Sequence, residues 1–151
     1  MHQSSDFILI IHSLFRWVML AVLLWAIVRA FSGWFGKKSW GSIDKKTGLY
    51  VQILADMQLL LGLVMYIFRS PRGLEIFQTQ DVGEVMKTGR YFAIEHPLMM
   101  IIAIILIHVG KSRSNKLTEA VKQHKAAAVF YTLALLFILS RVPWDHYLTW
   151  Y

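Results

Sequence analysis

Several polar side chains interrupt the apolar segments of this sequence, and they are the first candidates for chemistry. They are His12, Arg16, Asp56, Gln58, His96 and His108. An ionisable group at membrane depth costs several kcal/mol, roughly, unless it is paired or hydrated, so each one is a functional hypothesis. Neutral imidazoles that face each other across a helix bundle suit axial coordination of an iron in a haem plane.

The depths of His12 and His96 make these two histidines the leading candidate pair. His12 lies five residues after Phe7, and His96 lies five residues after Tyr91, where two long apolar segments begin. Both positions are about 8 Å along their helices, and the two helices run in the same direction. A single membrane histidine is as often a hydrogen-bonded contact between helices. The matched depth favours a pair of haem ligands.

Three arginines could serve a haem at this level. Arg16 follows His12 by one helical turn and shares its face, so it could pair with a haem propionate or with Asp56. The estimated depths, about 14 Å for Arg16 and about 18 Å for Asp56, favour a bridge between those two side chains. Arg90 and Arg141 lie nearer the polar surface and are predicted partners of the propionates, with interfacial anchoring as the alternative.

Small and flexible side chains also occur around this level. Gly62 would let a flat macrocycle approach the backbone, and Met100 follows His96 by one turn, although ordinary membrane packing uses the same residues. His108 and His124 are candidates for a second haem. The twelve-residue step from His96 to His108 turns the helix by about 120° beyond whole turns, so one haem is favoured over two.

The elements that must position these residues are membrane helices. The chain has 151 residues, of which 56% are hydrophobic and 17% are charged, which is typical of a membrane protein. Four apolar segments predict an all-α, integral membrane four-helix bundle in a single domain, 1–151. The predicted helices cover about 7–31, 49–68, 91–110 and 125–142. The absence of cysteine excludes disulfides and thiolate metal sites.

Two local features refine this helix prediction. Pro97 disfavours a helical conformation at the residue before it, so the third helix is expected to begin near Pro97 or to bend there. The polar connection between the second and third helices is too hydrophilic to insert. It is expected to contain a short interfacial helix around 81–87.

Charge patterning predicts the orientation of the bundle. Ten Lys and Arg residues lie in the segments 29–46 and 111–125, against five in the segments on the opposite side. The positive-inside rule therefore predicts a cytoplasmic location for the first side and an external, periplasmic location for both termini. The formal charge of +7 is then a feature of the membrane boundary. The basic segments lack the interleaved aromatic residues of a nucleic-acid surface, so nucleic acid is not an expected partner.

Motifs along nearly the whole chain resemble a known group of proteins. They are HSLFRW, LLLGLVMY, EHPLMMIIAIILIHVGKSRS, HKAAAVFY and SRVPW. The chain resembles small four-helix bacterial membrane proteins labelled cytochrome b or cytochrome b-like. The resemblance implies a b-type haem, with His12 of HSLFRW and His96 of EHP as its iron ligands.

Three functions follow as hypotheses from these observations. The leading one is a multi-pass cytochrome of the bacterial inner membrane that exchanges electrons with quinone, a periplasmic carrier or a larger membrane complex. The second is a non-redox accessory subunit whose buried His, Arg and Asp residues fix helix packing. The third is a proton-coupled carrier that uses Asp56 and His108 as relay groups. An electron-transfer protein or subunit is favoured over a stand-alone enzyme, catalytic residues are not assigned, and a homo-oligomer is compatible with each hypothesis.

Overall fold

The protein is a bundle of long helices. The computed structural model describes residues 2–69 and 73–142, and for residues 2–6, 69 and 88 only the backbone path. No strand occurs among these residues. The elements in chain order are α1 (His2–Phe35), α2 (Ser42–Val64), η1 (Met65–Arg69), α3 (Ile76–Thr79), α4 (Val82–Glu84), η2 (Val85–Gly89), η3 (Tyr91–Glu95), α5 (His96–Lys116) and α6 (Ala120–Ser140).

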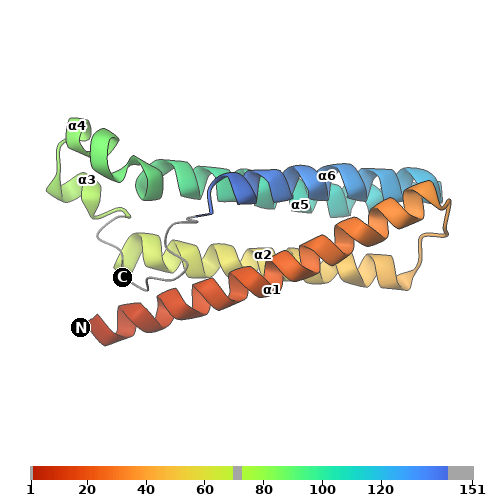
Figure 1. Ribbon diagram of the computed structural model, residues 1–151, viewed down its shortest axis with the longest axis horizontal. Coiled ribbons are helices and arrows are strands. Elements are labelled where there is room, and N and C mark those ends of the chain that lie inside the picture. The colour runs from red at the N-terminus through yellow and green to blue at the C-terminus, as the bar shows by residue number, and fades with distance from the viewer. Residues whose placement is uncertain (1, 70–72, 143–151) are drawn as a thin grey trace.

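The four long helices run up and down and form two layers (Figure 1). Helix α1 packs against α2 and α6, and α5 packs against the same two helices, so α1 and α5 lie diagonally across the bundle. Each of the four is long and apolar enough to cross a membrane. The start of α1 and the end of α6 lie at the same end of the bundle as α3 and α4 (Figure 1).

The structure confirms the all-helical class and four long apolar helices, but their ends differ from the prediction. Helix α2 begins at Ser42 rather than near 49, and α5 continues to Lys116 rather than ending near 110. The apolar pattern stops at the first polar residues, whereas the helices continue beyond it. In α2, Asp44 and Thr47 are buried on the inner face, so this polar turn is still packed in the bundle. The predicted short helix around 81–87 is confirmed by α4 and η2.

The start of α5 shows how the chain accommodates Pro97. A π-helical turn, η3, leads directly into α5, and Pro97 lies in the first turn of α5. Proline has no N–H to donate to the carbonyl of Ala93, one turn earlier. That carbonyl accepts a hydrogen bond from the Tyr66 hydroxyl instead, at 2.9 Å. The Ala93 carbonyl that Pro97 cannot use thus connects η1 with the start of α5 through Tyr66.

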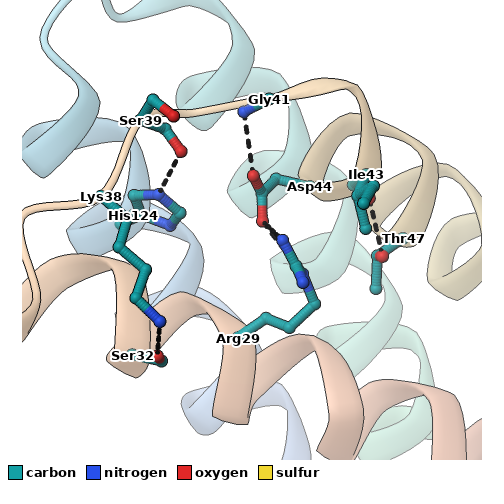
Figure 2. Close-up of polar contacts among 9 residues, drawn as sticks. All are labelled: Arg29, Ser32, Lys38, Ser39, Gly41, Ile43, Asp44, Thr47 and His124. Carbon is teal, nitrogen blue, oxygen red and sulfur yellow. Dashed lines mark hydrogen bonds and ion pairs between the residues drawn. The ribbon is translucent and has the colours of Figure 1, made fainter.

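A charged cluster closes the connection between α1 and α2 (Figure 2). The Arg29 guanidinium donates two hydrogen bonds to Asp44 Oδ1, from Nε at 3.1 Å and from Nη2 at 2.7 Å. The other carboxylate oxygen accepts from the backbone N–H of Gly41 at 2.9 Å and so caps the start of α2. Only 6% of the Asp44 side chain is exposed. The carboxylate is therefore buried, and both of its oxygens accept hydrogen bonds.

The two halves of the bundle differ in packing. In one half, which we call the packed half, the inner faces of α1, α2 and α5 are filled by fully buried side chains. These include Met19, Leu23, Ala26, Ile27, Ala30, Val51, Ala55, Ala103 and Ile107.

The other half contains residues 7–18 of α1, 56–68 of α2 and η1, and 96–102 of α5. None of these residues is fully buried. Helix α1 also diverges from α5 and α6 toward this end (Figure 1). We call it the open half. Both His12 and His96 lie in it.

Candidate functional site

His96 is held in one orientation by the end of another helix. Its Nδ1 lies 2.7 Å from the backbone carbonyl of Arg141, which also accepts from the Tyr91 hydroxyl at 2.8 Å. Helix α6 ends at Ser140, so this carbonyl belongs to the last turn, where oxygens lack helical partners. A carbonyl can only accept, so Nδ1 carries the proton and Nε2 keeps its lone pair. Histidines that bind a metal through one ring nitrogen commonly donate the other ring N–H to a backbone carbonyl in this way.

His12 lies against α2. The Gln58 amide nitrogen donates to the His12 backbone carbonyl at 2.9 Å and lies 3.3 Å from His12 Nε2. His12 Nδ1 is buried and has no hydrogen-bond partner among the described residues. Gly62 faces the same ring, since a Cβ there would lie 3.3 Å from His12 Cε1. The imidazole is therefore packed closely but is incompletely satisfied by the protein.

His12, Arg16 and His96 lie in the same half of the bundle. The two imidazoles are near enough to interact electrostatically, and Arg16 interacts electrostatically with both. The guanidinium also lies over the Trp17 ring, at 5.7 Å from its centroid. Helices α1 and α5 lie diagonally across the bundle, and the nitrogens of the His12 ring are directed toward Gln58 and Gly62 of α2. The two histidines therefore lie in the same half of the bundle, in agreement with their predicted depths.

The other two predicted arginines meet at a carboxylate that the sequence analysis did not single out. Glu95 Oε1 lies 2.6 Å from Arg90 Nε, and Glu95 Oε2 lies 3.1 Å from Arg141 Nε. Arg90 and Arg141 are thus held together by Glu95, and their role as propionate partners stays a prediction. Glu95 precedes His96 directly, so one short segment supplies both the acid and the imidazole.

Asp56 has a different partner from the one predicted. Its Oδ1 lies 2.7 Å from His108 Nε2, so the expected Arg16–Asp56 bridge is wrong. Gln58, which contacts His12, is only two residues beyond Asp56. Residues two apart point to opposite sides of a helix. The face of α2 that carries Asp56 is therefore turned toward α5, away from His12.

The two histidines predicted for a second haem have separate surroundings. His108 contacts Gln52 and Asp56 of α2. His124 is fully buried, with its ring edge-on to Trp40 and its Nε2 3.3 Å from the backbone carbonyl of Ser39 (Figure 2).

The His124 ring also fills the space beside Gly33, where a Cβ would lie 2.2 Å from His124 Cε1. His124 therefore packs α6 against the end of α1. The two rings have no common partner, so the geometry gives no support to a second haem. Met100, predicted near the first haem, packs against the hydrophobic core.

The sequence analysis assigned no role to Gln52 or Gln58, which both contact histidines in the structure. The spacing of Gln52 could have indicated its contact. Gln52 precedes Asp56 by one helical turn and so shares its face, where a polar contact to the neighbouring helix is expected. Gln58 lies about 15 Å inward from Phe68, against about 8 Å for His12, so spacing gave no reason to pair the two residues. The contact of His96 with the backbone carbonyl of Arg141 could not be predicted, because every residue carries a backbone carbonyl.

Comparison with known proteins adds no identity to this geometry. No family model, curated protein or solved structure matches the chain. Within the part of the chain that the structure describes, no three His, Cys, Asp or Glu side chains gather as a metal site.

Proposed function

We propose that this chain is an integral membrane electron-transfer protein that binds one b-type haem between α1 and α5. The observation that carries the proposal is the open half of the bundle, in which both His12 and His96 lie. The packed half is filled by the chain's own side chains, whereas the open half has no fully buried residue on α1, α2 or the first turns of α5. A planar cofactor between the two histidines would supply the missing core.

Histidine is a usual axial ligand of haem iron, and the structure prepares His96 for this role further than His12. His96 Nε2 has a free lone pair because Nδ1–H is committed to the Arg141 carbonyl. His12 has one ring nitrogen with only a long contact to Gln58 and another with no partner. Gly62 lets the His12 ring pack closely against α2, so the ring must turn away from α2 to reach an iron. The resemblance of the sequence to cytochrome b-like proteins supports the same assignment.

The chain's own residues would set the properties of the site. A haem supplies reversible one-electron transfer when it is bound. Arg16 places positive charge beside both imidazoles, which favours the reduced form of a centre and suits a propionate. Arg90 and Arg141 are already organised around a carboxylate, so their geometry suits binding of a second one.

The membrane setting of the proposal follows from the helices and their charges. Four helices are long and apolar enough to span a bilayer. The positive-inside rule places the basic end of the bundle, at the α1–α2 and α5–α6 connections, in the cytoplasm and both termini outside. We place the protein in a bacterial inner membrane. Quinone, a periplasmic carrier or a larger membrane complex would exchange electrons with it.

Titration of haemin into the purified apoprotein in detergent tests the proposal. We expect saturation at one equivalent per chain, with a sharp Soret band and, after reduction, the narrow α-band of six-coordinate haem. A chain that takes up no haem, or only a broad and unsaturable amount, would support the non-redox accessory subunit instead. Detergent micelles without protein control for unspecific partitioning of haemin.

A further inference from the structure

A cavity lies between α2 and the last turns of α5, at the basic end of the bundle. Its volume is about 620 Å³, which is within the range of sites for small molecules. Gln52 lines it from α2, and the other lining residues lie on α5 between His108 and Lys116. His96 begins the same helix, so the cavity is at the other end of α5 from the candidate haem site.

Cations and hydrogen-bond donors line this cavity. Lys111, Arg113 and Lys116 supply three positive charges, and none of the described residues that line it is acidic. Ser112 and Asn115 add a hydroxyl and an amide. Ammonium, guanidinium and neutral N–H or O–H groups all donate to phosphate oxygens. The lining therefore fits an anion with several oxygens, such as a phosphate group.

The contacts within the protein leave two of these cations available. Lys111 Nζ donates to Gln52 Oε1 at 2.5 Å, which uses one of its three N–H groups. Lys116 is exposed and has no hydrogen bond or ion pair within the part of the chain that the structure describes. The Arg113 guanidinium lies over the Phe130 ring of α6, at 5.9 Å from its centroid. Lys111 and Lys116 are therefore best placed to bind a ligand directly.

One carboxylate lies close to the cavity, but it already has a partner. Asp56 Oδ1 lies 2.7 Å from His108 Nε2, and Asp56 itself does not line the cavity. The other ring nitrogen, His108 Nδ1, lies 3.1 Å from Gln52 Nε2. A row of contacts from Lys111 through Gln52 and His108 to Asp56 thus fixes the wall of the cavity and holds the Lys111 ammonium at its edge.

An apolar stripe on α5 leads to this cavity. Leu98, Ile101 and Ile105 are exposed and recur at helical spacing, and we call them the α5 stripe. The next residues on the same face are His108 and Ser112, which line the cavity. A ligand with a phosphate and an apolar chain would cover both the cavity and the stripe. Free phosphate would cover only the cavity.

We propose that the cavity binds the phosphate of an anionic glycerophospholipid, with an acyl chain along the α5 stripe. The positive-inside rule places this end of the bundle in the cytoplasmic leaflet, where basic pockets between membrane helices bind anionic headgroups. Lys111 and Lys116 bind the phosphate oxygens, and Ser112 and Asn115 donate further hydrogen bonds. The inference uses the membrane setting of the proposed function but not its haem.

Native mass spectrometry of the apoprotein in a non-ionic detergent, with added dioleoyl phosphatidylglycerol, tests the site. We expect one lipid per chain to bind more tightly than any further lipid and more tightly than dioleoyl phosphatidylcholine. Lys116→Gln should weaken this binding by about fivefold, and Lys111→Gln combined with Lys116→Gln by about 25-fold. Circular dichroism checks the folding of both variants. Lys116→Gln keeps the contact between Lys111 and Gln52, so it tests the site without disturbing the wall of the cavity.

Lys46→Gln combined with Lys122→Gln provides the matched control. Both lysines are exposed at the basic end of the bundle, but neither lines the cavity. The control removes the same charge as the double variant of the cavity and should bind phosphatidylglycerol as the wild type does. An equal loss of binding in the two double variants would overturn the site, because diffuse attraction by the basic end would then explain it.

Two further measurements separate a lipid from a free phosphate and the site from the proposed function. Glycerol 1-phosphate and inorganic phosphate carry the charge without an acyl chain, so neither should displace the bound lipid. Displacement by either, or equal binding of phosphatidylcholine, would overturn the assignment to an anionic lipid. A chain that is recovered from the soluble fraction without detergent would overturn the membrane setting and the lipid site together. A membrane protein with no tightly bound phosphatidylglycerol would overturn the lipid site alone.

Discussion

Replacing His96 with alanine is expected to remove the six-coordinate haem spectrum and to weaken haem binding by at least about tenfold. The reason is the geometry of its ring, in which the Arg141 carbonyl holds Nδ1–H at 2.7 Å and leaves Nε2 as the donor. Alanine removes the donor and its support together. Haemin titration of the variant, followed by absorption and by electron paramagnetic resonance, measures the effect.

Two further variants separate ligation from folding. His96→Met should restore a six-coordinate spectrum with a raised reduction potential, because a thioether can ligate iron but stabilises the ferrous state. Leu98→Ala changes a neighbouring side chain that is 48% exposed, and it should leave the spectrum unchanged. If His96→Ala kept the wild-type spectrum, the assignment of His96 as an iron ligand would be wrong.

Replacing Asp44 with alanine is expected to lower the free energy of unfolding by about 3 kcal/mol. The substitution leaves the Arg29 guanidinium without its two carboxylate hydrogen bonds at the α1–α2 connection. It also removes the acceptor of the Gly41 N–H at the start of α2. Unfolding of the variant by sodium dodecyl sulfate in mixed micelles, followed by circular dichroism, measures the change.

An exposed ion pair provides the matched control for Asp44→Ala. Glu119 and Lys122 lie 2.8 Å apart, but their side chains are 64% and 60% exposed. Removal of such a pair changes stability by about 0.5 kcal/mol or less. Equal losses in Asp44→Ala and Glu119→Ala would contradict the structural role of the buried carboxylate.

The four helices could be predicted from the sequence, but their ends could not. Length and apolar content define the part of a helix that crosses a membrane. They carry no information on how far the helix continues into polar residues, as α2 does through Asp44 and Thr47. Those residues are buried by the α1–α2 connection, which depends on the tertiary structure.

Depth could be predicted better than direction. Residue spacing placed His12 and His96 at one level, and both lie in the open half of the bundle. The same estimate matched Arg16 with Asp56, which instead pairs with His108. Spacing along an axis fixes the level of a side chain, whereas its partner depends on how each helix is rotated against its neighbours.

The support of the candidate site was the least predictable part. His96 is oriented by a backbone carbonyl at the end of α6, and Glu95 joins two arginines from separate elements. Both contacts require the end of α6 to lie beside the start of α5, which no local pattern in either segment specifies. The haem itself stays a prediction from the two histidines and the open half.

The absorption spectrum of the wild-type protein, purified from haem-replete cells and recorded before and after reduction, tests the central claim most directly. The account predicts a Soret band and a narrow reduced α-band, with one haem b per chain in the pyridine haemochrome assay. A colourless protein that is folded by circular dichroism would contradict it.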